Sequence, residues 1–126
     1  MSITPKITNK KLKVMKTINY KDIDTMKNPH GVDAKKLFEI EHVQVIHMLI
    51  KPGESLKRHS TPVDVFFYVL EGEGYVEVGD EKELITKDTL VESPKNIPHI
   101  LYNEGKVDFR VLVVKTPKPT KATQIK

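Results

Sequence analysis

The five histidines of this chain, at positions 30, 42, 47, 59 and 99, are the side chains that point most directly to chemistry. Imidazoles bind first-row transition metals, exchange protons near neutral pH and hydrogen-bond small polar ligands. The absence of cysteine excludes disulfides, thiolate nucleophiles and cysteine-ligated metal sites. The sequence also lacks a Gly-x-Ser-x-Gly nucleophile turn, a phosphate-binding glycine-rich loop and a dinucleotide fingerprint. Any chemistry therefore depends on imidazole, carboxylate and hydroxyl groups.

A metal site built on two imidazoles needs a third protein ligand, and two residues are candidates for that third position. Glu92 lies in a short β-like run just before the segment that leads to His99. His47 lies in a strongly apolar run, which predicts that it is at least partly covered. Each also has a simpler interpretation: Glu92 as an exposed strand residue, and His47 as a hydrogen-bonded core or interface group.

The length of 126 residues is typical of a single domain, and 38% hydrophobic with 30% charged residues indicates a globular protein. The longest uncharged apolar run, residues 65–70, is far shorter than the roughly 20 residues of a membrane-spanning helix. The N-terminus lacks the apolar stretch of a secretory signal. We therefore expect a cytoplasmic protein without membrane association.

The net charge of +4 comes from the two ends of the chain. Residues 1–21 contain six lysines and residues 115–126 contain four, and neither segment contains an acidic residue. The remaining 11 basic residues share residues 22–114 with all 17 acidic residues, so the body of the chain is acidic. Nucleic-acid-binding domains usually carry a basic face on the folded unit itself. We expect no specific nucleic-acid partner and interpret the lysine-rich ends as solubilising, with phosphate binding as the alternative.

The chain divides into a basic N-terminal extension (residues 1–15), a single domain (residues 16–115) and a basic, proline-containing tail (residues 116–126). Prolines cannot donate to a sheet and the tail has little to bury, so we expect the tail to be flexible. Within the domain, Pro29 and Gly31 predict a loop over residues 28–36. His30 lies in this loop and His42 in another, so we expect both to be exposed to solvent.

From residue 37 onward the chain consists of short runs rich in valine, isoleucine, phenylalanine and tyrosine, each closed by glycine, proline or aspartate. Such spacing is typical of a β-sandwich or barrel. A glycine–aspartate pair at residues 79–80 predicts a tight hairpin. The sequence therefore predicts an all-β fold. The predicted strands are 37–40, 43–50, 63–71, 75–78, 82–85, 90–92, 99–103 and 107–114.

The run 63–71 is apolar on both faces of the strand it predicts. Alternating side chains place Val65, Phe67 and Val69 on one face. The opposite face carries Phe66 and Tyr68. A strand that is apolar on both sides is covered on both sides, by the barrel interior and by a second sheet or subunit. We therefore expect a homodimer.

Two segments of the chain resemble the two motifs of the cupin family, whose fold is a double-stranded β-helix or jelly-roll barrel. The first, with Gly53, His59, Thr61, Val65 and Gly72, is similar to Gly-x5-His-x-His-x3-Glu-x6-Gly. The second, with Pro94, Asn96, His99 and Asn103, is similar to Pro-x-Gly-x2-His-x3-Asn. Asn at the second motif's glycine position is acceptable because Asn tolerates a positive φ angle. The resemblance covers roughly residues 37–115.

Metal-binding cupins use three histidines and one glutamate, and the resemblance places these ligands at His59, Thr61, Val65 and His99. Two of the four ligands are therefore replaced, which makes the barrel mouth less anionic and weakens its affinity for divalent ions. The resemblance implies that Thr61, Val65, Phe67 and Tyr102 shape the pocket.

Three functions remain open. The first is a small cupin that binds a small organic ligand, such as an organic anion or a sugar-like molecule, through His59 and His99. The second is a metal-dependent enzyme of the dioxygenase or isomerase type, with Fe, Mn, Ni or Zn on the two histidines and a third ligand, Glu92 or His47. The third is a non-catalytic structural dimer whose tails recruit an acidic partner.

Overall fold

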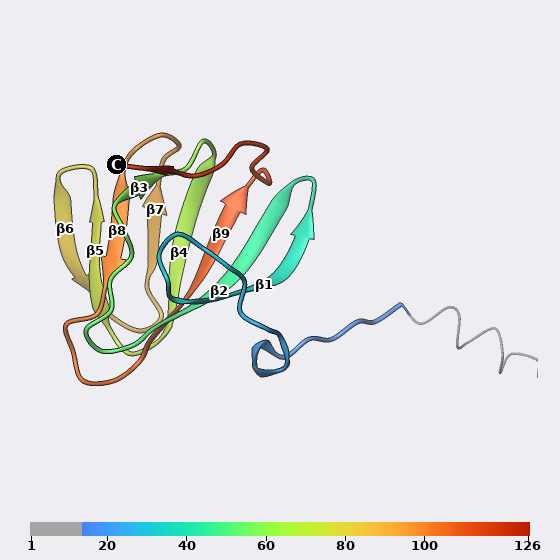
Figure 1. Ribbon diagram of the computed structural model, residues 1–126, viewed down its shortest axis with the longest axis horizontal. Coiled ribbons are helices and arrows are strands. Elements are labelled where there is room, and N and C mark those ends of the chain that lie inside the picture. Colours follow the sequence, from blue (N-terminus) through green and yellow to red (C-terminus); the bar gives the residue numbers. More distant parts are fainter. Residues whose placement is uncertain (1–13) are drawn as a thin grey trace, which may run out of the picture.

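The structure, a computed structural model, describes residues 14–126 and consists of two five-stranded sheets (Figure 1). All strand pairs are antiparallel. The first sheet has the order β1-β2-β9-β4-β7 and the second the order β10-β3-β8-β5-β6. The strands are β1 (Asp33–Ile40), β2 (Val43–Ile50), β3 (His59–Ser60), β4 (Asp64–Glu71), β5 (Gly74–Val78), β6 (Glu81–Ile85), β7 (Leu90–Ser93), β8 (His99–Tyr102), β9 (Phe109–Thr116) and β10 (Gln124–Ile125). The all-β double-stranded β-helix expected from the sequence is confirmed.

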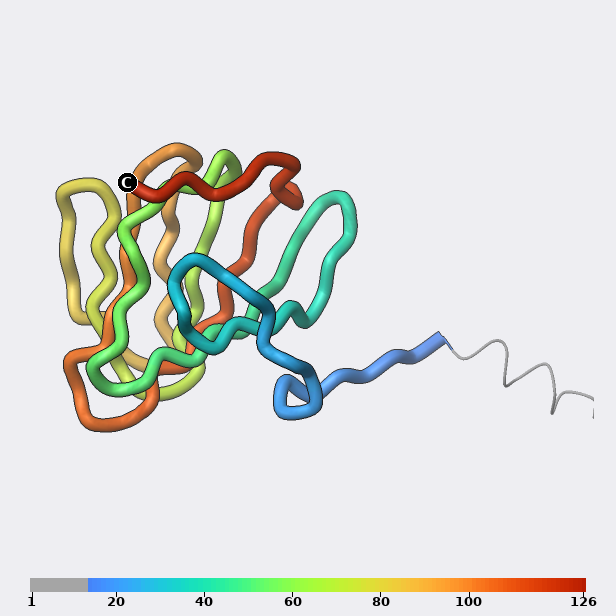
Figure 2. The backbone as a smooth tube through the Cα atoms, viewed as in Figure 1, coloured from blue at the N-terminus to red at the C-terminus, as the bar shows by residue number. Residues whose placement is uncertain are grey.

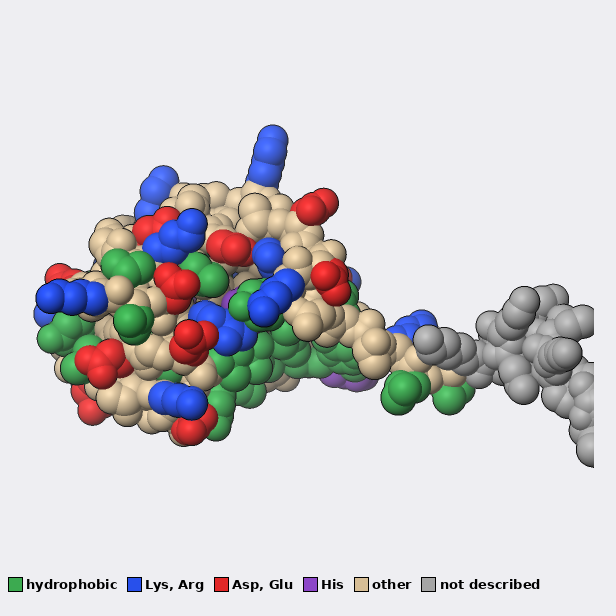
Figure 3. Space-filling view, turned by 90° about the horizontal axis from the view of Figure 1, so that it is seen from below, with side chains coloured by type: hydrophobic (Ala, Val, Ile, Leu, Met, Phe, Trp, Pro, Cys, Tyr) green, Lys and Arg blue, Asp and Glu red, His purple; other side chains and the backbone are tan. Residues whose placement is uncertain are grey.

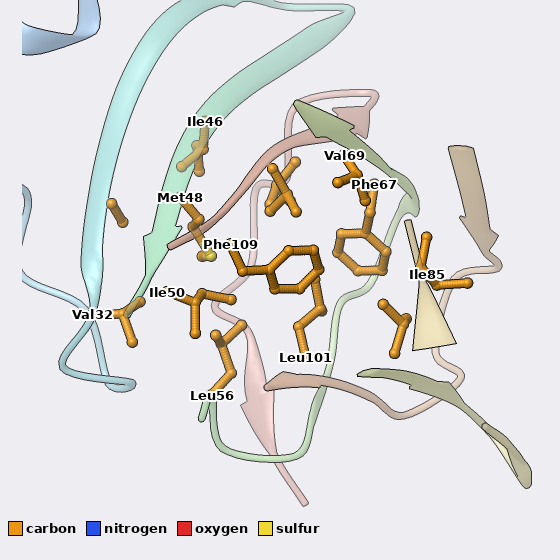
Figure 4. Packing of buried hydrophobic residues seen from close by; sticks show 14 of the residues in the cluster. Val32, Ile46, Met48, Ile50, Leu56, Phe67, Val69, Ile85, Leu101 and Phe109 are labelled. Atoms are coloured by element: carbon orange, nitrogen blue, oxygen red, sulfur yellow. The ribbon is translucent and has the colours of Figure 1, made fainter. Parts of the chain in front are cut away.

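The core lies between the two sheets and follows the predicted alternation. On β4 the buried side chains are Val65, Phe67 and Val69, whereas the residues between them are half-buried on the outer face. Phe67 from β4 and Phe109 from β9 both belong to the middle of the cluster, as does Leu101 from the second sheet (Figure 4). These alternating apolar residues fix the inner face of each strand, because a shift by one residue would turn it outward.

Two turns form as the sequence predicts. Gly79 and Asp80 join β5 to β6 in a two-residue hairpin, with Val78 opposite Glu81. Asn96, at the glycine position of the second motif, has a φ angle of 65°. Its amide donates a hydrogen bond to the Thr61 carbonyl, which fixes the loop before His99 against the strand segment after His59.

The C-terminal segment is the main difference between the predicted and the observed fold. The sequence predicts a flexible tail, but Ile125 pairs with His59 on β3, and the Lys126 amide donates to the Arg58 carbonyl. The prolines of this segment precede the paired residues, so they do not block the two backbone positions that join the sheet. The segment runs along the upper end of the barrel, past β4 and β7 (Figure 2).

The N-terminal part of the described chain covers a second side of the barrel. After the short 3-10 helix η1 (Tyr20–Asp22), residues 23–32 run across the front of the sheets (Figure 2). Strand β1 then begins at Asp33, inside the predicted loop 28–36. The predicted extension at residues 1–15 falls almost entirely outside the described residues. Within residues 14–126 no helix is long and apolar enough to span a membrane.

Candidate functional site

A cavity of about 300 Å³ opens between the two sheets at the end of the barrel that carries the histidines. This volume is at the lower end of the range for small-molecule sites. Its apolar lining comes from Ile46, Met48, Leu56, Val65, Phe67 and Val113. Residues 26–30 line one side and Ala122 and Thr123 the other, so both ends of the described chain contribute to the site.

His59 and His99 converge in this cavity although 40 residues separate them in the sequence. They are opposite each other on β3 and β8, and their Nε2 atoms are 3.0 Å apart. Both rings are buried, with 6% and 2% of the residue exposed. The ring of Phe67 meets His99 edge to face, with centroids 5.1 Å apart, and so closes the apolar side of the pair.

The hydrogen-bond partners of the two rings determine where their protons lie. The Lys57 carbonyl can only accept, so His59 Nδ1, at 2.6 Å from it, carries a hydrogen. In the neutral ring Nε2 of His59 is then an acceptor, and His99 Nε2 must donate to it. Nδ1 of neutral His99 is therefore an acceptor for the Ser93 hydroxyl, 2.7 Å away. The result is a chain of donors that runs from Ser93 through both histidines to the Lys57 backbone.

Both rings are held in their neutral forms. Burial, followed by the nearby His59 and Lys115, lowers the pKa of His99 from 6.5 to about 3. Burial also lowers the pKa of His59, and the bond to the Lys57 carbonyl opposes this effect only in part. Since protonation would put a charge into an apolar cavity beside an ammonium group, the pair stays uncharged at neutral pH.

Among the lining residues that the sequence does not assign to the site, two lie close to the histidine pair or carry charge into the cavity. His30, expected to be exposed, is half-buried, and its ring lies 4.4 Å from that of His59. Its Nδ1 accepts a hydrogen bond from the Lys57 amide, which anchors the loop over the cavity. Lys115, near the end of β9, is the other. Neither belongs to a motif segment, so spacing alone gave no signal for them.

The predicted pocket residues fall into two groups. Thr61, Val65 and Phe67 line the cavity together with His59 and His99. Tyr102 does not, because Leu101 is the buried residue of that part of β8 and Tyr102 points to the outer face. There its hydroxyl donates to Glu77 and its ring stacks on Tyr75.

Neither proposed third ligand lies at the cavity. Glu92 is exposed on the outer face of β7, and its neighbour Ser93 takes the inward position. His47 points outward from β2, since the residues on either side of it fill the core. Tyr20 stacks on the His47 ring at 4.0 Å, and Arg110 Nε donates to its Nε2. The alternation of strand side chains excludes both residues from the cavity.

The donor set of the cavity does not fit a divalent metal ion. A separation of 3.0 Å suits two neighbouring imidazole ligands, but a stable site needs at least one further donor. The other two ligand positions implied by the resemblance hold the Thr61 hydroxyl and the methyl groups of Val65, and the Lys115 ammonium group lines the same cavity. Within residues 14–126 no three His, Cys, Asp or Glu side chains are arranged to bind a metal.

Comparison with known proteins adds a family match and a relative. The model of the Cupin domain matches residues 46–115. An uncharacterised protein of Methanocaldococcus jannaschii is 28% identical over 89 residues, which cover 70% of this chain and 77% of the relative. Its crystal structure, described as an RmlC-like cupin with a double-stranded β-helix fold, has a TM-score of 0.67 at 22% identity, covering 82% of this chain and 92% of that one.

Two further crystal structures are similar to this chain. A protein from Thermus thermophilus has a TM-score of 0.72 and 29% identity, with 83% of this chain and 100% of that one covered. A polyketide cyclase from Streptomyces resistomycificus has a TM-score of 0.76 at 19% identity, with 88% and 84% covered. The second likeness concerns the fold alone, because the same fold hosts many unrelated activities.

Proposed function

The chain belongs to the cupin family, because the Cupin domain model matches more than half of its length, and we propose that its barrel binds a small organic ligand through His59 and His99. The observation that carries this proposal is the convergence of the two buried imidazoles, 3.0 Å apart, on a cavity that is lined mainly by apolar side chains. Ligand sites typically combine such an apolar lining with a few convergent polar groups.

The histidine pair offers a ligand one donor and one acceptor. Opening the bond between the two rings frees the Nε2 hydrogen of His99 and the Nε2 lone pair of His59. A hydroxyl, amide or carboxylic acid group carries both functions and can bridge the two atoms. Ser93 and the Lys57 carbonyl keep the rings oriented while this happens, because they bond the opposite nitrogens.

The metal-dependent alternative makes a different prediction, and one set of measurements separates the two. The untagged protein is loaded anaerobically with ferrous, manganous, nickel and zinc ions, dialysed and subjected to elemental analysis. In parallel, benzamide, benzyl alcohol, ribose and benzoate are titrated while the imidazole resonances are followed by NMR. We expect saturable shifts of His59 and His99 with at least one organic probe and no stoichiometric metal.

Variants assign the signal to the site. His99→Gln should weaken probe binding by at least ten-fold, whereas His42→Gln, at an exposed turn, should leave it unchanged. Near-stoichiometric metal that is lost in both His59→Gln and His99→Gln would overturn the proposal in favour of a metal site. Failure of all four probes to shift the pocket resonances would also overturn it.

We also propose that the chain forms a homodimer through the outer face of the first sheet. Phe66 and Tyr68 on β4 lie opposite Val114 and Leu112 on β9, and Leu90 on β7 extends the same apolar face. These side chains are half-buried or exposed. Hydrophobic side chains gather in one area of the surface in Figure 3, whereas charged ones are scattered over the rest. Contiguous apolar surface of this kind marks interaction sites.

A further inference from the structure

The charge of Lys115 in the cavity lining indicates which chemical class of ligand the pocket would bind. It has the same orientation on β9 as the buried Val111 and Val113, so its side chain enters the barrel rather than leaving it. Its partner across the ladder on β4 is Val65, and both residues line the cavity. A half-buried ammonium group therefore lies beside an aliphatic side chain at the mouth of the pocket.

The charge of Lys115 has no counter-ion among the residues that the structure describes. None of the four ion pairs within residues 14–126 includes it, and none of the described residues that line the cavity is acidic. Burial lowers the pKa of Lys115, which shows that its charged form is disfavoured in this position. The three neighbouring histidines do not compensate, since they are neutral or cationic but never anionic. A carboxylate from outside would supply the missing partner.

Two uncharged donors of the same cavity are also free. The hydroxyl of Thr61, a residue with only 2% of its surface exposed, is buried without a hydrogen-bond partner among the described residues. His30 uses Nδ1 as an acceptor from the Lys57 amide, so its neutral ring carries a hydrogen on Nε2. None of the hydrogen bonds of the described residues uses that hydrogen. An unpaired buried donor such as the Thr61 hydroxyl costs free energy that a ligand oxygen can recover.

We propose that the cavity takes a small monocarboxylate with a compact apolar body. Lys115, Thr61 and His30 form the subsite for its carboxylate, and His99 donates its Nε2 hydrogen to the same group. Ile46, Met48 and Phe67 then contact the apolar body. The cavity of about 300 Å³ sets the size limit of the ligand. This inference rests on the proposed function and specifies the ligand class of the same pocket.

The test compares two isosteric probes, benzoate and benzamide, by NMR titration of the full chain. Benzoate should bind at least ten-fold more tightly than benzamide to the wild-type protein. In Lys115→Met this preference should fall at least ten-fold, while the affinity for benzamide changes less than three-fold. Lys118→Met removes a lysine that lies outside the cavity lining and should leave both affinities unchanged.

Two further substitutions keep the test informative if Lys115→Met disturbs the fold. Thr61→Val removes the unpaired hydroxyl at nearly constant shape, so it should weaken benzoate binding by three-fold or more without lowering the melting temperature. Val65→Glu places an internal carboxylate opposite Lys115 and should abolish benzoate binding. Val65→Gln, of the same size but uncharged, should retain more of it.

The outcomes separate this inference from the function on which it rests. Binding of benzamide as tight as that of benzoate would overturn the carboxylate subsite and leave small-molecule binding intact. An unchanged benzoate preference in Lys115→Met would do the same. If benzoate fails to bind while other probes do, the inference is wrong; if no probe binds at all, both proposals are wrong.

Discussion

His47 should make the folded protein sensitive to mild acid. Its ring is buried on the outer face of the first sheet, with only 1% of the residue exposed, between Tyr20 and Arg110. Burial, and then the charge of Arg110, lowers the pKa of His47 from 6.5 to about 4. As the pH falls from 6.5 to 4, the unfolded chain takes up a proton that the folded protein rejects, so the free energy of unfolding decreases.

The size of the effect follows from the width of that pH window. One proton bound only by the unfolded chain changes the free energy of unfolding by about 1.4 kcal/mol per pH unit. The shift of His47 therefore corresponds to a loss of about 3 kcal/mol between pH 6.5 and pH 4. This is a large share of the roughly 5–15 kcal/mol that stabilises a typical domain.

The substitution His47→Phe isolates this contribution. Phenylalanine keeps the stacking on Tyr20 but neither titrates nor carries the buried Nδ1 that has no hydrogen-bond partner. Urea unfolding at fixed protein concentration, at pH 7.5, 6.5, 5.5 and 4.5, gives the difference between variant and wild type. His30, His59 and His99 are present in both proteins, so their own titration cancels.

We expect the stability of His47→Phe relative to wild type to grow by about 1.4 kcal/mol per pH unit as the pH falls below 6.5. His42→Gln, at an exposed position, should show no such trend. A difference between His47→Phe and wild type that is constant over the whole pH range would refute the assignment of a lowered pKa to His47.

Two other predictions concern the surface and the end of the chain. Phe66→Glu should convert the proposed dimer to a monomer in light scattering, because it places a charge within the apolar outer face. Leu84→Glu, on the other sheet, is the control and should leave the mass unchanged. An unaltered mass for Phe66→Glu would contradict this interface. Deletion of residues 120–126 breaks a strand pairing of only two residues, so it should cost little stability. The same deletion removes Ala122 and Thr123 from the cavity wall. The truncated protein should fold and release bound benzoate faster in NMR line-shape measurements, and an unchanged release rate would show that the segment does not restrict exit.

The strands that the sequence predicts well are those with long apolar alternation. Strand β2 has the predicted bounds 43–50, and β4 differs by one residue at its start. The first half of β1, by contrast, lies inside the predicted loop and contains lysines and an aspartate, and only Ala34 is buried there. The two-residue strands β3 and β10 are too short to have a period, and only their backbone pairing identifies them.

The motif spacing located part of the candidate site, and alternation explains the errors. His59, Thr61, Val65, Phe67 and His99 line one cavity, as the resemblance implies. The wrong assignments are all displaced by one position from an inward side chain. Tyr102 follows Leu101, Glu92 precedes Ser93, and His47 lies between two core residues. The sequence shows that side chains alternate between two faces of each strand. Which of the two faces points into the barrel is settled only when the sheets are packed.

The electrostatic character of the pocket depends on a residue that neither motif contains. A motif marks positions along one segment, whereas the charge of a cavity sums contributions from every strand that reaches it. Lys115 reaches it because β9 pairs with β4 in the register that sets Lys115 opposite Val65. An acidic residue at position 65 would form an ion pair with Lys115 and leave the pocket with little net charge. With valine there, the ammonium group is left for a ligand, so the pairing of two distant strands decides which ions the pocket attracts.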